Sequence, residues 1–233
     1  MIVYVGQTRS RALMATLDRH AVREFVVRGE LPARRTSLGF AHDNGAYRDW
    51  RAGRAFNVVR WERDMRWMSY RGIVPDFVVV PDIVAGGLAS LAWSAAWRDV
   101  VPAEFPAYLA VQDGMTARDV IPHLARYAGI FVGGSLPWKL ATGAAWAQLA
   151  RTRGLRCHIG RVGTAARVCW ARAAGATSID SCLPLRAEEH LAAFLAAIRD
   201  ADQIAIAAST ATPRRARRRP ENRSARQLEL FAA

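Results

Sequence analysis

The chain of 233 residues is 52% apolar and 23% charged, a composition that excludes a disordered polypeptide and is sufficient for one domain core. Its 33 basic residues outnumber 20 acidic ones, giving a net charge of +13, and every basic residue except Lys139 is an arginine. This excess predicts a partner rich in phosphate, although the preference for arginine over lysine is also expected of a GC-rich genome.

The first 212 residues alternate short β-branched runs with amphipathic helical patterns. Eight strands are predicted, at Ile2–Val5, Glu24–Val27, Leu38–His42, Phe77–Pro81, Ala107–Gln112, Gly129–Gly133, Arg156–Gly160 and Thr177–Asp180. Helices are predicted at Arg9–Arg19, Ala55–Tyr70, Leu88–Val100, Ala117–Tyr127, Pro137–Arg153, Thr164–Ala173 and Glu188–Arg199. Thr116 and Thr164 suit helix N-caps, and Gly129, Gly154 and Gly175 suit helix ends.

Regular alternation of this kind predicts parallel strands joined by right-handed crossovers, and eight of them predict a compact (β/α)8 TIM-type barrel over residues 1–212. The link between the second and third strands, ELPARRTS, has no helical pattern. A seven-stranded closure and a doubly wound open sheet are therefore the alternatives.

Residues 213–233 form a separate segment. They hold seven arginines and two glutamates, a net charge of +5, which leaves +8 on residues 1–212. A dense cluster of like charge with little to bury predicts a disordered arm.

The cysteines and the absence of long apolar runs indicate the compartment. Cys157, Cys169 and Cys182 have spacings that fit neither a disulfide framework nor a zinc knuckle. The chain shows no signal-peptide pattern, and no apolar run approaches the roughly 18 residues of a membrane span. We expect a cytoplasmic protein without a membrane partner.

Polar residues and glycines cluster directly after the predicted strands, positions that share one face of a parallel barrel. The set comprises Asp43, Tyr47, Asp82, Gln112, Gly133, Gly134, His158, Arg161 and Asp180. Each also has a structural interpretation: helix caps or Asx turns for the aspartates, turns with positive φ for the glycines, a surface amide for Gln112, and the core for Tyr47 and His158. Their common position at one end of successive strands favours a binding pocket.

These residues resemble motifs of the tRNA-guanine transglycosylase superfamily, whose members exchange guanine for a 7-deazaguanine base. Asp43-Asn44-Gly45-Ala46-Tyr47 resembles the family's Asp-Ser-Gly-Gly segment with its aromatic residue, and Val111-Gln112-Asp113-Gly114 resembles Val-Gln-Gly-Gly. Gly133-Gly134-Ser135 resembles Gly-Gly-Leu, and Ile179-Asp180-Ser181-Cys182-Leu183-Pro184 resembles the nucleophile segment Phe-Asp-Cys-Val-Met-Pro. The order along the chain agrees, and the match runs from about Phe40 to Pro184.

The resemblance implies that Asp180 attacks the sugar C1′ and holds the strand covalently while the bases exchange. Asp43 would act as the general acid and base if burial or nearby negative charge raises its pKa. Two carboxylates with divided duties are expected for this chemistry. His158 and Arg161 would hold the flanking phosphate or sugar.

The resemblance also implies how guanine would be recognised. Asp82 would accept from N1–H and the exocyclic amine, and Gln112 and the backbone N–H of Gly134 would donate to O6. The pair Gly133 and Gly134 would allow the close approach of the backbone. Tyr47 would stack on the base, a contact worth about 1 to 3 kcal/mol.

The bacterial tRNA enzymes carry a zinc module after the nucleophile segment, whereas no cysteine follows Cys182 here. The chain is therefore similar to the reduced, DNA-acting branch of the superfamily found in bacterial genomic islands and bacteriophages. This implies DNA as partner, a preQ0-like 7-deazaguanine base as co-substrate, a flipped target nucleotide and no metal or redox cofactor. The alternatives are a tRNA transglycosylase acting with a partner subunit and a non-catalytic nucleic-acid-binding barrel.

The end of the arm carries a second motif. Gln227, Leu228, Leu230 and Phe231, within QLELF, resemble the peptide that binds the bacterial sliding clamp. Such a peptide would raise the local concentration of the protein on replicating DNA. The alternative is an amphipathic end that packs on its own barrel.

Overall fold

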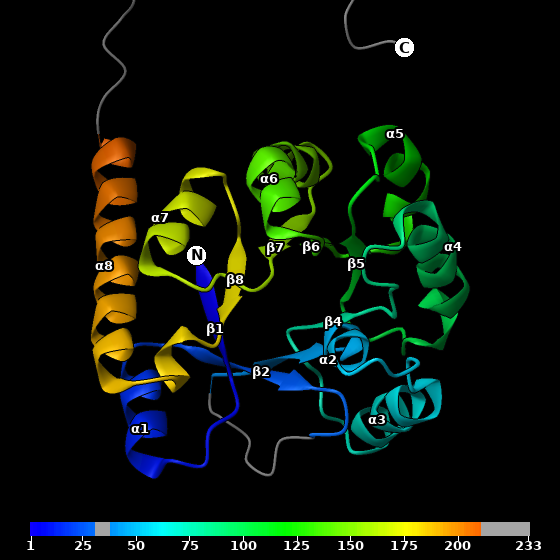
Figure 1. Cartoon of the computed structure of the whole chain (residues 1–233), viewed down its shortest axis with the longest axis horizontal. Coiled ribbons are helices and arrows are strands. Elements are labelled where there is room, and N and C mark those ends of the chain that lie inside the picture. Colours follow the sequence, from blue (N-terminus) through cyan, green and yellow to red (C-terminus); the bar gives the residue numbers. More distant parts are fainter. Residues whose placement is uncertain (31–37, 211–233) are drawn as a thin grey trace, which may run out of the picture.

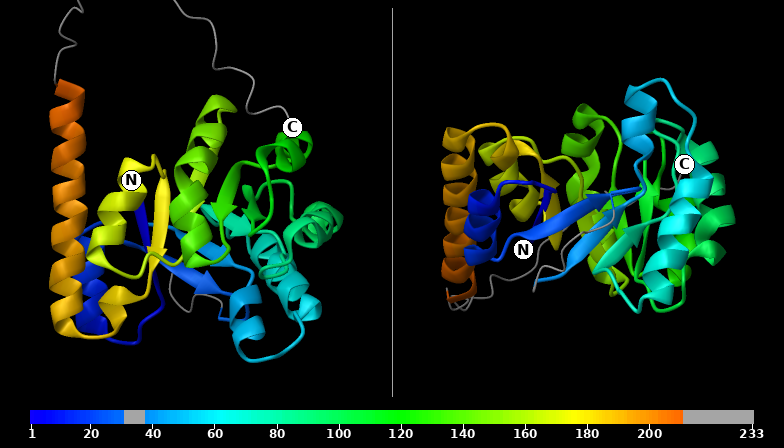
Figure 2. Two further views of the ribbon diagram at one scale, coloured as in Figure 1. Left: turned by 45° about the horizontal axis from the view of Figure 1, so that its top comes forward. Right: turned by 90° about the horizontal axis from the view of Figure 1, so that it is seen from below.

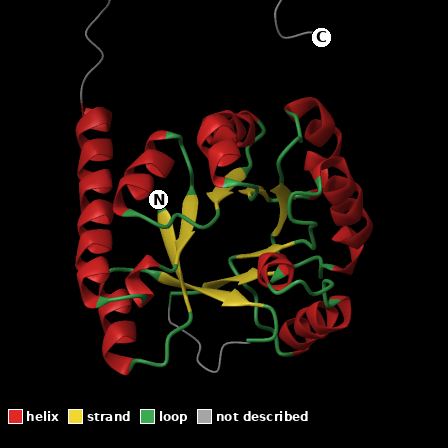
Figure 3. Ribbon diagram, viewed as in Figure 1, coloured by secondary structure: helices red, strands yellow, loops and turns green. Residues whose placement is uncertain are grey.

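The computed structural model describes residues 1–30 and 38–210, which form a closed ring of eight parallel strands surrounded by helices (Figures 1 and 3). Spatial neighbours follow the order of the chain from β1 to β8, and β1 pairs with β8 with Tyr4 opposite Asp180. The predicted (β/α)8 barrel is therefore confirmed, and the open sheet and the seven-stranded closure are excluded.

All eight strands are short and lie close to their predicted positions. They are β1 Ile2–Gly6, β2 Arg23–Val27, β3 Phe40–Asp43, β4 Phe77–Val79, β5 Ala107–Val111, β6 Gly129–Val132, β7 Arg156–Ile159 and β8 Ser178–Ser181. Each pairs in parallel with its neighbours. All the carboxyl ends of the strands therefore meet at one rim.

The helices are α1 Arg11–Arg19, α2 Ala46–Arg51, α3 Val58–Tyr70, α4 Gly87–Trp97, α5 Ala117–Val120, α6 Leu136–Thr152, α7 Ala165–Ala173 and α8 Glu188–Thr210. Three 3-10 turns accompany them, η1 Arg98–Val100, η2 Ile121–Arg126 and η3 Leu183–Leu185. The helices differ from the sequence prediction in three places. Helix α2 was not expected, α8 continues beyond the predicted end at Arg199, and the helix predicted at Ala117–Tyr127 is α-helical only to Val120 and continues as η2. Helix α8 lies along α7 and close to α1 on one side of the barrel (Figures 1 and 2).

Most of the predicted helix boundaries have the expected chemistry. The Thr164 side chain accepts from the Arg167 N–H at the start of α7, and Thr116 bonds the Asp119 carboxylate through its N–H and hydroxyl. Gly154 and Gly175 follow α6 and α7 with φ of 68° and 90°, the left-handed conformation that ends helices. The prediction that Gly129 ends a helix is wrong, because this residue begins β6.

Two apolar clusters stabilise the barrel. The larger one lies between the strands and the helices, and the smaller one fills the ring of strands. The inner cluster is mostly aromatic: Tyr4, Phe25, Ala41, Phe77, Val79, Tyr108 and Ala110 are buried there, with Ile2 and Phe131 packed against them. Phe77 and Tyr108 stack with ring centroids 4.1 Å apart. The inside of the barrel, beneath the carboxyl ends of the strands, is therefore filled by packed side chains.

Several predictions fall on parts of the chain that the structure does not describe. Residues 31–37 of the link between β2 and β3, the arm at 213–233 and its peptide Gln227–Phe231 lie outside the described residues. In the described part of the chain, no helix has the length and apolarity needed to cross a membrane. Cys157, Cys169 and Cys182 are all free thiols.

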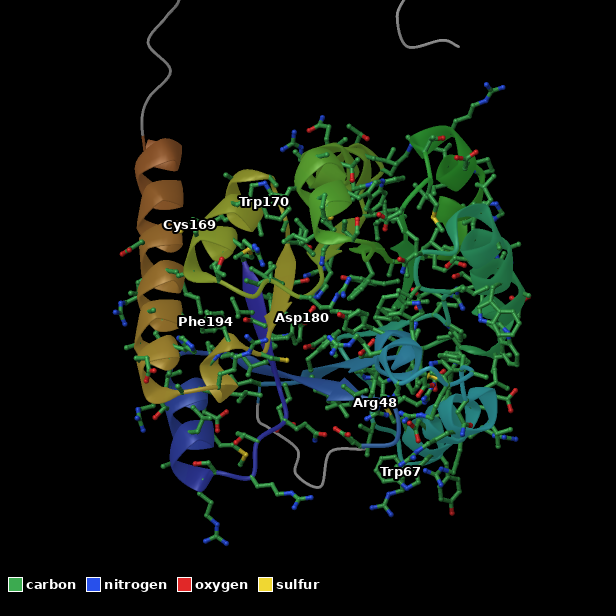
Figure 4. The ribbon with its side chains drawn as sticks, in the orientation of Figure 1. Arg48, Trp67, Cys169, Trp170, Asp180 and Phe194 are labelled. Carbon is green, nitrogen blue, oxygen red and sulfur yellow. The ribbon has the colours of Figure 1, made fainter. Side chains whose placement is uncertain are left out.

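The attachment of α8 can be tested at Phe194, which is 0% exposed (Figure 4). We expect Phe194→Ala to lower the free energy of unfolding by about 3 to 5 kcal/mol, because it leaves a cavity in the larger cluster. Urea denaturation followed by circular dichroism measures this. Leu140→Ala, at a side chain that is 44% exposed, is the control and should change stability by less than about 0.5 kcal/mol. Equal effects of the two variants would contradict the packing of α8.

Candidate active site

The carboxyl rim of the barrel gathers the three predicted carboxylates. Asp43 ends β3, Asp82 follows β4 and Asp180 lies in β8. Asp82 and Asp180 are buried, and the pKa of Asp43 responds to the charges of both. None of the three is a helix cap in this structure, since Gly45 and Gly86 occupy the N-cap positions of α2 and α4.

Asp180, labelled in Figure 4, is anchored through one carboxylate oxygen. Its Oδ1 lies 3.0 Å from His158 Nε2 and accepts from the backbone N–H of Arg161 at 2.9 Å. Within the described residues, the hydrogen bonds to this carboxylate all fall on Oδ1. An oriented carboxylate whose second oxygen keeps its lone pairs is suited to attack an electrophilic carbon.

His158 lies inside the barrel and is 0% exposed. Its ring stacks on Phe131 at 4.9 Å and on Phe25 at 5.5 Å. Burial lowers the pKa of His158, so that the ring is neutral, and its Nδ1 lies 2.9 Å from Ser178 Oγ. With a charged Asp180 as acceptor, Nε2 carries the proton and Nδ1 accepts from the Ser178 hydroxyl. The predicted phosphate contact of His158 is therefore wrong, and the ring orients Asp180 instead.

Asp82 is held by two side-chain amides. Asn44 Nδ2 donates to its Oδ1 at 2.7 Å, and Gln112 Nε2 donates to its Oδ2. The Gln112 Oε1 in turn accepts from the Gly134 N–H at 3.0 Å. Gln112 and the Gly134 N–H, predicted to donate to a base, thus donate within the protein and fix Asp82. Each Asp82 oxygen still has a lone pair for a donor from outside.

The glycine pair after β6 is required by close packing. A Cβ at Gly133 would lie 2.7 Å from Gln112 Nε2, and one at Gly134 would lie 2.5 Å from an Asp113 carboxylate oxygen. Gly134 also has φ of 70°, which a residue with a side chain adopts at a cost. The pair therefore lets Gln112 reach Asp82 across the rim.

Tyr47 and Arg161 contact each other above this network. The Arg161 guanidinium lies 3.9 Å from the centroid of the Tyr47 ring, and its Nη2 donates to the Gly134 carbonyl at 2.5 Å. Trp50, which is 54% exposed, stacks beside Tyr47 with ring centroids 5.7 Å apart. Arg161, which was predicted to bind a phosphate, thus covers one face of Tyr47, which was predicted to stack on the base.

The buried carboxylates differ in their affinity for protons. The pKa of Asp43 is raised to about 7, chiefly by burial and also by the charge of Asp180, while the Gly45 backbone N–H opposes the rise. Burial raises the pKa of Asp82 to about 6, against the bonds from Asn44 and Gln112. Asp43 can therefore give and take a proton near neutral pH, as general acid and base chemistry requires.

Two cavities of about 380 and 420 Å³ lie elsewhere. The first, at the amino ends of the strands, is lined by Tyr4, Arg23 and Asp76 among others, and the second lies between α1 and the start of α8. Among residues 1–30 and 38–210, no group of three or more His, Cys, Asp or Glu side chains is placed to hold a metal ion.

No protein-family model matches this chain, and a search of the curated proteins gives no significant match.

Sequence reasoning missed two polar residues of this site. Asn44 was noted only as part of a motif, although its amide fixes Asp82 and donates to the Val80 carbonyl at 2.8 Å. Lys139 is 3% exposed and donates to the Gly160 carbonyl at 2.5 Å. Its position as the single lysine of a chain rich in arginine was a signal in the sequence.

The buried charge of Asp43 should reduce stability at high pH. Because its folded pKa of about 7 exceeds the ordinary value of 3.8, the native state binds this proton more tightly, and stability is lost as pH rises from about 4 to 7. We expect Asp43→Asn to gain stability over the wild type between pH 4 and pH 8, by up to about 4 kcal/mol. Chemical denaturation at both pH values measures the change.

The control is Asp119→Asn. The pKa of Asp119 is lowered by its bonds from Thr116, so its contribution to stability is present at pH 8 and lost on acidification. This variant should therefore lose stability at pH 8 relative to pH 4, the opposite sign. A difference between Asp43→Asn and the wild type that stays constant with pH would contradict the assignment.

Proposed function

We propose that this protein exchanges guanine in DNA for a 7-deazaguanine base through a covalent intermediate on Asp180. The observation that carries the proposal is that three carboxylates at one rim have three different environments. Asp180 is oriented with one oxygen available, Asp43 has a pKa of about 7, and Asp82 is fixed by two amides. The match of four motifs in the same chain order supports the same chemistry.

In the first half-reaction, Asp180 Oδ2 attacks C1′ of the target nucleotide. The bond from O to C1′ forms, the bond from C1′ to N9 breaks, and the proton of Asp43 passes to the departing guanine. In the second half-reaction, Asp43 takes a proton from the incoming base, whose nitrogen attacks C1′ and releases Asp180. The strand stays intact because the ester between Asp180 and C1′ replaces the first glycosidic bond, and the new glycosidic bond then replaces the ester.

Asp82 is the group that would recognise the base. Its two oxygens, each with a remaining lone pair, match the N1–H and the exocyclic amine that guanine and 7-deazaguanine share. Adenine has no donor at N1, so it would leave a remaining lone pair of the buried carboxylate without a donor. The entering base would displace the Arg161 guanidinium from Tyr47, take its place on the ring, and free Arg161 for the neighbouring phosphate.

The polymer would be held by positive charge. Residues 1–212 carry a net +8, and exposed Arg51 and Arg54 lie in and just after α2, the helix that presents Tyr47 and Trp50 at the rim. A base within a duplex must leave the stack to reach a buried carboxylate, and phosphate contacts would offset that cost.

Incorporation of radiolabelled guanine into polymer tests the function directly. We expect label to enter double- or single-stranded DNA and not tRNA. Asp180→Asn should abolish incorporation while DNA binding, measured by gel shift, is retained. Label in tRNA alone would favour the tRNA enzyme, and binding without any exchange would favour the non-catalytic barrel.

The rate of the first half-reaction should follow a bell-shaped curve with pH. Asp82 must be ionised to accept from the base, and Asp43 must be protonated to serve as the acid, so the rate should rise near pH 6 and fall near pH 7. Single-turnover release of labelled guanine between pH 5 and 9 measures this. A rate that keeps rising through pH 8 would exclude Asp43 as the acid.

A further inference from the structure

Lys139 is a buried charge that the proposed chemistry does not use. It is the single lysine beside 32 arginines, it lies on α6, and it is 3% exposed. Its Nζ donates to the Gly160 carbonyl at 2.5 Å. A buried ammonium is costly, so its presence needs a compensating interaction.

The Gly160 carbonyl belongs to the turn that holds the proposed nucleophile. The next residue, Arg161, has φ of 58° and donates its N–H to Asp180 Oδ1 at 2.9 Å. A Cβ at Gly160 would lie 2.7 Å from the Phe131 ring and 3.5 Å from Asp180 Oδ1. The backbone thus passes close to the carboxylate in a strained conformation, and such a turn persists only when its surroundings hold it.

The ammonium also lies in the field of several charged groups. The pKa of Lys139 is lowered to about 8, chiefly by burial and also by the charges of Arg161 and Arg167, while Asp180 and Asp113 oppose the shift. The pKa of His158, the second group bonded to Asp180, is in turn lowered by the charge of Lys139. Asp180 and Lys139 are therefore electrostatically coupled across the Gly160 peptide.

We propose that Lys139 is a positioning residue for Asp180, which fixes the Gly160–Arg161 turn through the Gly160 carbonyl and supplies the positive charge that a buried nucleophilic carboxylate needs. The role of Asp180 as nucleophile rests on the proposed function, whereas the coupling between the two residues does not. Lysine suits this position because its compact ammonium directs three donors from a flexible stem, whereas a planar guanidinium needs a wider site.

Because the chain has a single lysine, its NMR signal needs no assignment, and the electrostatic coupling between Lys139 and Asp180 can be measured directly. Protein labelled with ε-¹³C lysine should give one side-chain resonance, with a titration midpoint near pH 8. Asp180→Asn should move this midpoint to lower pH because it removes a charge that favours the ammonium. Asp119→Asn, which removes a carboxylate outside the group that acts on Lys139, should leave it in place. An unchanged midpoint in Asp180→Asn would overturn the proposal.

The effect on chemistry is tested with Lys139→Met, which keeps the length of the side chain but removes the donor and the charge. We expect the single-turnover rate of covalent adduct formation to fall at least roughly tenfold, about 1.4 kcal/mol, with the Kd for DNA unchanged. A variant that melts cooperatively and forms the adduct at the wild-type rate would overturn the proposal. If the variant does not fold, the lysine titration decides alone, and if the wild type forms no adduct, the proposed function fails while the coupling is still measured.

Discussion

The pairing of β1 with β8 is the constraint on which the site depends. It closes the sheet with Tyr4 opposite Asp180, and closure brings the carboxyl ends of β3, β4 and β8 to a single rim. Carboxylates that are far apart in the sequence then lie close enough to interact, and desolvation and mutual repulsion raise the pKa of Asp43. The same closure therefore creates the chemical difference among the three aspartates and costs stability near neutral pH.

The three carboxylates at the rim have different environments. The His158 ring stacks on Phe25 and Phe131 and packs at a tilt against Phe77, and its Nε2 lies 3.0 Å from Asp180 Oδ1. Asp82 lies against amides, and Asp43 lies among charges of its own sign. Identical side chains thus become an oriented acceptor, a carboxylate fixed by two amides and a carboxyl group with a raised pKa through their neighbours alone.

The barrel and the polar residues at its rim could be predicted because the periodicity of apolar residues, and the position of a residue relative to a strand, can be read from short segments of sequence. Short β-branched runs alternating with helices specify parallel strands, and residues after such runs lie on one face. Contacts that depend on packing could not be predicted from the sequence. His158 was expected to contact a phosphate but is packed among aromatic rings, and Gln112 was expected to contact a base but donates to Asp82. Helix α2 was not predicted because six residues are too few to show a helical period. The contact of Lys139 with the Gly160 carbonyl was not predicted because it depends on the fold.

The proposed covalent bond between Asp180 and the sugar can be trapped. Quenching the wild-type protein with a guanine-containing oligonucleotide in acid, followed by proteolysis and mass spectrometry, locates the adduct. We expect one modified peptide, with the sugar on Asp180 and guanine released in equal amount. An adduct on Asp43 or Asp82, or release of guanine without any adduct, would contradict it.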